Sequence, residues 1–520
     1  MSLEIAVVLL GLGFLLLDLW IAPEHKRKLG YLAAFALVVV FACSFAFEFK
    51  ADPQSSGKLH FIPIDTSLAF NNSYVLDSMA LLFKRFFLIA AVLVLIMAAE
   101  FADHIEAGIS EYYSLILFAL AGMMFASSAN DFTMLFVSLE LITVTFYVLT
   151  SFRRSSVQSL EAGVKYLVIG GLSTGFTVFG IALVSGTATT VLGTRALNGM
   201  NFNDLAEFVQ YHAPGHDPAG IPLPLVAGLV LILAGLGFKI AAVPFQIWAP
   251  DVYQGSPTPT TAFLAVGSKA AGFVLLLRVL FTAVPDVTLT PHWEKLLIAL
   301  SALTILYGNL CAIPQRNLKR LLGYSSIAHA GYLLMGVAAM TRAGSTAIVY
   351  YLTGYLFTVI AAFTVITLVT RKANGEDITA LAGLNRRSPF LAAAMTLAMV
   401  SLAGIPPLAG FFGKFLLLKS VIEQGASSGA YYGLAAIAVI GVVISLYYYF
   451  GVVRAIYWSN DATDVSTIDT PLATKFALIV CMAGIFFVGI YPQPVLQLAS
   501  RATQPLTQLD AAKSSAVVQR

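Results

Sequence analysis

Long apolar stretches alternate with short polar breaks along almost the whole chain. A bilayer core of about 30 Å is crossed by roughly 20 residues of α-helix, so each apolar stretch of that length predicts one membrane span. The pattern predicts an all-α integral membrane protein with about 14 transmembrane helices, over residues 3–22, 30–49, 75–99, 112–128, 131–150, 161–186, 224–249, 257–284, 294–312, 320–341, 344–371, 388–422, 431–457 and 471–493.

Composition agrees with a bilayer as the solvent. Hydrophobic residues make up 58% of the chain and charged residues 11%, whereas an ordinary soluble domain has roughly 25% charged residues. The net charge of +3 is small, and the basic residues form short clusters at segment ends. Because a nucleic-acid groove needs a continuous basic stripe, the sequence indicates the lipid bilayer as a partner and no nucleic acid.

The basic residues of the polar breaks also predict an orientation. Cytoplasmic connections of membrane proteins are enriched in Lys and Arg. If the N-terminus lies on the outer face, most basic residues of the polar breaks lie on the cytoplasmic side. They are Lys26, Arg27, Lys28, Arg153, Arg154, Arg316, Lys319, Arg320, Arg371, Lys372, Arg386, Arg387, Arg454 and Lys475. We therefore expect both termini on the outer, periplasmic face of a bacterial inner membrane, with an organelle membrane as the alternative.

At least five ionisable side chains lie at membrane depth in the predicted spans, among them Glu140, Lys165, Lys239, Lys269 and Lys414. A charge at membrane depth costs several kcal/mol unless it is paired or hydrated, so each of these residues suggests a function. Burial destabilises the charged form of a lysine and a nearby carboxylate restores it, so such groups can hold and release protons. The alternative is a static ion pair between Glu140 and one lysine. The excess of lysines over carboxylates favours proton transfer.

Prolines interrupt two of the spans that carry these lysines. Pro244 follows Lys239 by five residues, and Pro406 and Pro407 precede Lys414. Broken helices persist at membrane depth where protein or water satisfies the freed backbone groups, and paired broken helices are typical of inverted-repeat transporters. Helices 4–8 and 9–13 are thus predicted to be two inverted five-helix repeats. The corresponding regions are 1–111 (helices 1–3), 112–286, 287–460, and 461–520 (helix 14 and tail).

His329 is a further polar landmark in the apolar interior, near Ser325, Ser326 and Tyr332. One interpretation is that His329 relays protons or gates water. The alternative is an ordinary core histidine whose ring nitrogens are hydrogen-bonded. His212 and His216 are spaced for a metal, but Pro214 lies between them and disfavours a helix, so a loop is expected.

The chain has no Rossmann or P-loop fingerprint and no CxxC pair among its three cysteines. We expect no cofactor in this chain, so energy for proton transfer must come from partner subunits.

Three segments of this sequence resemble a known family: FQIWAPDVYQGSPTPTTAFLAVGSKAAG from Phe245, NLKRLLGYSSIAHAGYLLMG from Asn317, and IPPLAGFFGKF from Ile405. They are similar to the antiporter-like subunits shared by respiratory complex I and multisubunit cation/proton antiporters. Within this family the chain most resembles the subunit N branch of proton-pumping NADH:quinone oxidoreductase. The M branch and one antiporter paralogue usually carry glutamate where Lys414 stands, and the L branch has an additional lateral helix.

The resemblance implies a role for each candidate residue. Glu140 is similar to the glutamate that modulates the broken-helix lysine, Lys239, while Lys269 resembles the connecting lysine and Lys414 the lysine near the outward exit. Lys165 resembles a lysine that faces a neighbouring subunit, and His329 is carried over as a relay candidate. The predicted site also includes Pro244, Pro406 and Pro407, which lie at the helix breaks.

The implied activity is quinone reduction by NADH or a related donor, coupled to proton export. NADH, FMN, iron-sulfur clusters and quinone are then expected in partner subunits. The expected neighbours are the antiporter-like subunit M and the small membrane subunits K, J, A and H. Two alternatives stay open: a subunit of a cation/proton antiporter without a redox partner, and a structural membrane scaffold whose charges are static pairs.

Overall fold

The computed structural model describes residues 1–51, 59–61, 66–189, 191–192, 195–196, 199–211, 221–284, 290–371, 375–459 and 466–506. The loop predicted around His212 and His216 lies outside these residues.

The helices before the first break and the three short hairpins account for the first half of the chain. Their bounds are α1 Ser2–Leu17, η1 Pro23–His25, α2 Lys26–Cys43, η2 Ser44–Phe47, β1 Phe49–Ala51, β2 Leu59–Phe61, β3 Ser67–Ala69, β4 Tyr74–Leu76, α3 Ser78–Phe101, η3 Ala102–His104, α4 Ile109–Ser127, α5 Phe132–Thr150, α6 Val157–Ala188, β5 Val191–Leu192, β6 Arg195–Ala196, α7 Phe202–Tyr211 and α8 Leu223–Ile240. The strands pair in antiparallel order as β1 with β2, β3 with β4 and β5 with β6.

Among its described residues, the second half has helices joined by short connections and no named strand. Its elements are α9 Trp248–Gly255, α10 Thr258–Phe263, η4 Leu264–Ser268, α11 Lys269–Arg278, η5 Val279–Ala283, α12 Thr290–Ala312, α13 Leu318–Ala338, α14 Arg342–Thr370, η6 Ile378–Leu381, α15 Leu384–Arg387, α16 Pro389–Ala403, α17 Ala409–Glu423, α18 Ala430–Trp458, α19 Leu472–Ile490, α20 Pro492–Ala502 and η7 Gln504–Leu506. Both η4 and η5 are π-helical.

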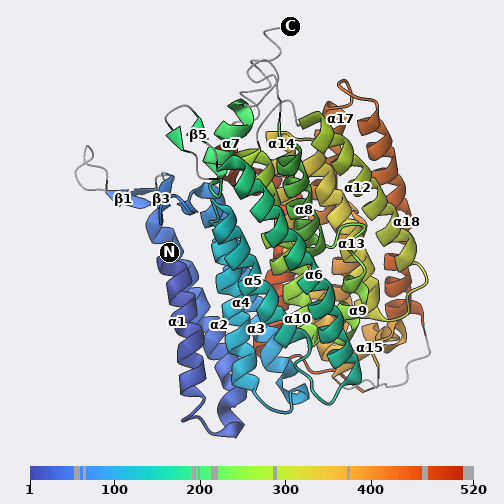
Figure 1. Cartoon of the computed structure of the whole chain (residues 1–520). Helices are drawn as coiled ribbons and strands as arrows, with labels where there is room; N and C mark the ends of the chain where they lie inside the picture. Colours follow the sequence, from blue (N-terminus) through green and yellow to red (C-terminus); the bar gives the residue numbers. More distant parts are fainter. Residues whose placement is uncertain are drawn as a thin grey trace.

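Most helices run side by side in one upright bundle (Figure 1). Among the described residues, twelve helical segments are long and apolar enough to cross a membrane, and α1 and α16 are shorter apolar helices. A helical, multi-pass membrane protein is therefore confirmed. The bundle has two distinct ends in Figure 1. The terminal end, at the top, carries the strands and α7, and the basic end, at the bottom, carries the turn between α1 and α2. This turn leads into Arg27, which shares the carboxylate of Glu100 with Arg371 at the same end.

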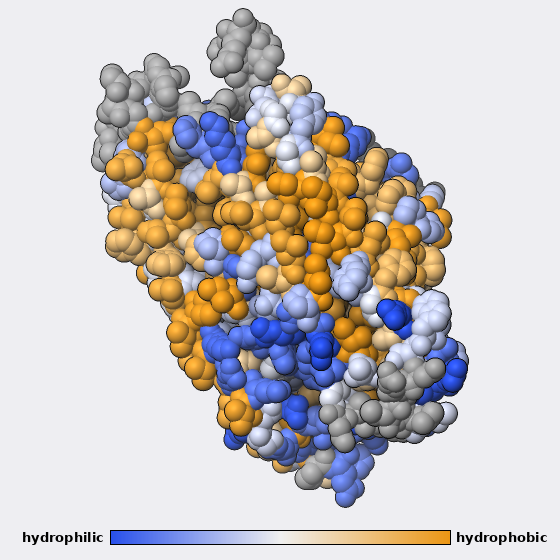
Figure 2. Space-filling model, turned by 90° about the vertical axis from the view of Figure 1, so that its right-hand side faces the viewer, coloured by the Kyte–Doolittle hydropathy of each residue, from blue (hydrophilic) through white to orange (hydrophobic). Residues whose placement is uncertain are grey.

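The surface follows the same division. On the face seen in Figure 2, apolar side chains dominate the upper and middle part, and hydrophilic side chains gather toward the basic end. Large apolar side chains point outward along the bundle, for example Leu9, Phe179 and Val443, each 61% exposed. Such a surface is unfavourable in water and requires lipid or partner helices around it.

Two predicted spans are divided by breaks. The span 224–249 becomes α8, which ends at Ile240, and the span 388–422 becomes α16 and α17. At the first break Ala241 is left-handed with φ of 58°, and the indole of Trp248 donates 3.0 Å to the carbonyl of Phe238. Pro244, like the pair Pro406 and Pro407, lies in the connection between the two helical pieces. A proline cannot donate a backbone hydrogen bond, which explains why the helices stop there.

Three segments form the centre of the bundle. The 18-residue windows of 258–283 and of α13 are 100% buried, and that of α14 is 89% buried. Small residues allow close approach around them, since a side chain at Gly331 would meet the backbone of Ile305 on α12. The centre therefore holds the lysine and the histidine singled out above, Lys269 and His329.

Two helices at the terminal end are amphipathic. Helix α7 buries Phe202, Leu205 and Phe208. Helix α20 was not foreseen, because its residues were assigned to a tail; it buries Val495 and Ala499 against the bundle.

Candidate functional site

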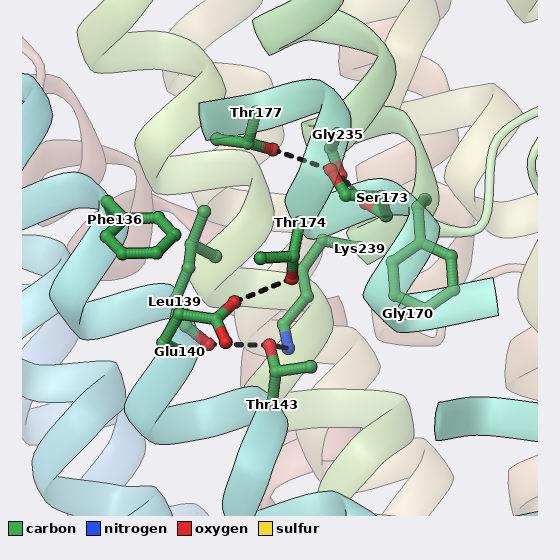
Figure 3. Close-up of a pocket in the computed structure, with 11 residues that line it drawn as sticks. Phe136, Leu139, Glu140, Thr143, Gly170, Ser173, Thr174, Thr177, Gly235 and Lys239 are labelled. Carbon is green, nitrogen blue, oxygen red and sulfur yellow. Dashed lines mark hydrogen bonds between the residues drawn. The ribbon is translucent and has the colours of Figure 1, made fainter. Parts of the chain in front are cut away.

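Glu140 and Lys239 face a small, partly open cavity of about 20 Å³ between α5, α6 and α8. Lys239 is in the last turn of α8, just before the break, and its Nζ donates 2.9 Å to the hydroxyl of Thr143. On the other side Thr174 donates 2.7 Å to Glu140 Oε1. Figure 3 shows both charged side chains pointing into the same space beside the two threonine hydroxyls. Among the described residues no ion pair joins Glu140 to Lys239, so the static pair considered for them is not formed in this structure.

Lys269 lies in the centre of the bundle, directly after the π-helical η4. Its side chain is buried, and Nζ donates to both the carbonyl and the hydroxyl of Ser326 on α13. The same hydroxyl is 3.0 Å from the hydroxyl of Tyr253 and accepts a 3.2 Å hydrogen bond from Tyr355. Short π-helical stretches occur frequently at functional sites because they re-aim side chains. Here the stretch directs a buried ammonium toward neutral oxygens.

His329 is one turn along α13 from Ser326 and is buried. One ring nitrogen is hydrogen-bonded to the hydroxyl of Tyr351, and the other lies 3.0 Å from the hydroxyl of Tyr449. Tyr449 is in turn hydrogen-bonded to Ser325. Since neutral imidazole donates through one nitrogen and accepts through the other, His329 can connect the two tyrosines.

Lys414 lies in the second turn of α17, immediately after the second break. Its Nζ donates 2.7 Å to the carbonyl of Leu402 and 3.2 Å to that of Ala403, at the end of α16. Gly404 is left-handed with φ of 86°, and a side chain there would come within 3.1 Å of Lys414 Cδ. At this break the lysine itself satisfies the backbone groups that the prolines free.

The buried groups follow one another across the bundle. Gly272 on α11 packs against the side chain of Lys239, one turn from Lys269, so the two lysines lie on adjoining helices. Lys414 Nζ lies 5.1 Å from the ring centroid of Tyr332, whose ring is 6.0 Å from that of His329. The order is therefore Glu140, Lys239, Lys269, His329 and Lys414.

Lys165 differs from these lysines. Its Nζ is 2.7 Å from Glu161 and 2.6 Å from Asp251, and 39% of the side chain is exposed. Asp251 also accepts from Arg320. Burial alone would raise the pKa of Asp251, but hydrogen bonds from Lys165 and Arg320 lower it below its ordinary value. Lys165 therefore belongs to an ion cluster at the basic end.

Several buried charges escaped the sequence argument, which inspected only the middle of the predicted spans. Lys84 and Glu4 form a 2.8 Å ion pair with 1% of each side chain exposed. Lys84 lies inside the predicted span 75–99, so the criterion that selected Glu140 would also have selected it, whereas Glu4 lies at the start of the span 3–22. The other missed groups are Asp77 with Arg278, Glu100 with Arg27 and Arg371, and Lys319 with Glu376.

No group of three or more His, Cys, Asp or Glu side chains is placed to hold a metal ion within the part of the chain that the structure describes.

The comparisons with known proteins agree on one family. Residues 129–445 match the family described as "NADH:quinone oxidoreductase/Mrp antiporter, TM". NADH-quinone oxidoreductase subunit N of Desulforamulus reducens is 37% identical over 501 residues, covering 96% of this chain and 97% of that protein. The subunit N of Moorella thermoacetica is 38% identical over 499 residues, with coverage of 96% and 97%.

Solved structures show the same architecture. A chain of respiratory complex I from Thermus thermophilus with bound aureothin superposes with a TM-score of 0.74 at 30% identity, covering 96% of this chain and 99% of that one. A chain of the archaeal membrane-bound sulfane sulfur reductase shares the fold, with a TM-score of 0.79 at 23% identity and coverage of 98% of both chains.

The chain belongs to the antiporter-like NADH:quinone oxidoreductase/Mrp family and, within it, to the subunit N family of the NADH-quinone oxidoreductases. The resemblance inferred from the three sequence segments is confirmed.

Proposed function

We propose that this chain is the proton-translocating subunit N of an NADH:quinone oxidoreductase and carries protons along Glu140, Lys239, Lys269, His329 and Lys414. One observation carries the proposal. Lys239, Lys269 and Lys414 are buried within the bundle, and each contacts only neutral hydroxyl or carbonyl oxygens in its hydrogen bonds. Ammonium groups without a paired carboxylate are costly as static structure but suited to gaining and losing protons.

The same proposal includes a symmetric arrangement. Helices α4, α5, α6, α8 with α9, and the segment 258–283 form the first five-helix unit, in region 112–286. The second unit, in region 287–460, comprises α12, α13, α14, α16 with α17, and α18. Each unit has its break in the fourth span, next to Lys239 or Lys414. Regions 1–111 and 461–520 add four further crossings, giving 14, with both termini on the periplasmic face of the inner membrane.

Partners are inferred from the surface beside Glu140. On the same face of α5, Val137 is 55% exposed and Val144 is 52% exposed, so Glu140 lies close to the perimeter of the bundle. A carboxylate is unfavourable against lipid at this depth. We infer that a neighbouring subunit, from among M, K, J, A and H, covers this face, while NADH, FMN, the iron-sulfur clusters and quinone are bound elsewhere in the complex.

Substitution of Glu140 by glutamine tests the proposal. The amide keeps the shape and can still accept from Thr174, so only the charge that acts on Lys239 is lost. We expect proton transport driven by NADH in membrane vesicles to fall about fivefold per assembled complex. Glu140→Asp, which retains the charge, serves as the matched control and should keep most of the activity. Normal transport in Glu140→Gln would remove Glu140 from the route.

A further inference from the structure

An open cavity of about 530 Å³ lies at the basic end of the bundle. Its wall is formed by the ends of α3, α9 and α14, the starts of α6 and α13, and the segment 375–377. The polar side chains that line it include His104, Arg153, Gln254, Asn317, Glu376 and Asp377. A cavity of this size and polarity admits water and small solutes.

A buried cation lies behind this wall. Lys319 lies in the first turn of α13. Its position in a polar break of the sequence predicts a loop residue, but only 2% of it is exposed. Its Nζ is 2.7 Å from Oε1 of Glu376, whose side chain is 25% exposed, and it donates 2.9 Å to the carbonyl of Ser256. Glu376 is therefore the contact between the cavity and the buried ammonium.

The backbone holds Glu376 in this position. The amide of Leu318 donates 2.8 Å to the carbonyl of Glu376, and the amide of Ile378 donates 2.8 Å to that of Arg316. Asn317 and Asp377 face each other between these two bonds. The carboxylate is thus fixed against the start of α13 by main-chain bonds that its own substitution leaves in place.

Ser256, whose carbonyl accepts from Lys319, also carries a buried hydroxyl, and Tyr253 and Ser326 lie between it and Lys269. Ser256 is 1% exposed, and among the described residues its hydroxyl has no hydrogen-bond partner. Tyr253, three residues earlier and nearly one turn away, reaches Ser326 with its hydroxyl at 3.0 Å. Ser326 is seven residues after Lys319 on α13, which is about two turns or 10 Å. Ser326 is also the partner of Lys269.

We propose that Glu376 and Lys319 form the proton-loading entrance of this subunit, which serves Lys269 from the cavity at the basic end. This inference rests on the proposed function. The ammonium of Lys319 gives a proton to the hydroxyl track of Ser256 and Tyr253, and Ser326 passes one on to neutral Lys269. The Glu376 carboxylate then takes up a proton from the cavity and passes it to the neutral amine of Lys319. One proton moves inward and the pair regains its starting charges.

Glu376→Gln is the first test, in the assembled complex within membrane vesicles. The amide oxygen still accepts from Lys319, so the contact persists while the titratable group is lost. We expect NADH-driven proton transport per assembled complex to fall about fivefold. Asp377→Asn is the matched control, because it removes a carboxylate from the same segment and the same cavity; transport should stay close to that of the unmodified complex. Equal transport in both variants would overturn the proposal.

Chemical rescue separates a proton-loading role from a structural one. In Glu376→Ala the cavity gains room beside Lys319, and formate or acetate added to the vesicles should restore at least half of the lost transport. A failure of both acids to raise the rate would overturn the entrance. If Glu376→Gln is normal while Lys239→Ala and Lys414→Ala lose transport, the entrance is wrong and the proposed function stands. If all three variants are normal, the proposed function fails as well.

Discussion

Replacing Lys414 by alanine is expected to lower NADH-driven proton transport by roughly tenfold or more per assembled complex, with quinone reduction slowed in parallel because the two are coupled. The reason is positional. Lys414 is the only ammonium that contacts the end of α16 in the described structure, and it lies above Tyr332 on the far side of His329 from Lys269. Alanine leaves no titratable group there.

The measurement compares proton uptake and quinone reduction in the same vesicles, after the amount of complex has been determined. Lys419→Ala is the matched control, since Lys419 is on the same helix, five residues later, with 59% of its side chain exposed. Lys239→Ala should resemble Lys414→Ala. If both relay variants pump normally, the buried lysines are structural charges and the scaffold interpretation takes precedence.

Replacing Lys84 by methionine is expected to cause the largest loss of stability. Methionine fills a similar volume but leaves Glu4, a buried carboxylate 1% exposed beside the hydroxyl of Tyr74, without its lysine partner. Breaking a buried ion pair by removing one partner costs about 3–5 kcal/mol. The remaining contact, from the N-terminal amine at 3.6 Å, is longer than the 2.8 Å pair that is lost. The yield of assembled complex and its thermal denaturation midpoint in detergent should both fall.

A double-mutant cycle provides the control. Glu4→Gln combined with Lys84→Met removes both charges, and we expect it to recover stability by an amount on the order of 2 kcal/mol relative to Lys84→Met alone. A double variant no more stable than the single one would show that packing, and not charge pairing, explains the effect. Proton transport per assembled complex should be unaffected in the double variant, because the pair lies outside the proposed route.

Hydropathy was sufficient for the fold class and for much of the candidate site. Lipid cannot satisfy backbone hydrogen bonds, so an apolar run of the right length must be a helix, and this holds whatever its neighbours are. The same energetics select Lys239, Lys269 and Lys414 as exceptional, since a charge within such a run always carries a cost. Proline likewise ends a helix locally, and the structure has its breaks beside Pro244 and Pro406.

The ion-pair partner of each charge could not be deduced from hydropathy, because it depends on which helices pack against each other. Lys165 and Asp251 are 86 positions apart, yet they form an ion pair, and Lys84 with Glu4 does the same across 80 positions. The hydropathy of each segment is identical whether or not such a partner is present.

The sequence by itself determined a membrane protein of many helices, two of them broken, with lysines inside apolar runs near the breaks. Only the tertiary structure decided what each charge touches. It gave Lys165 two carboxylates, buried Lys319 behind Glu376 although both lie in polar segments, and surrounded His329 with tyrosines from α14 and α18. The physical reason is that the free-energy cost of burying a charge can be predicted from the hydropathy of its own segment. The ion pairs and hydrogen bonds that offset this cost come from residues distant in the chain.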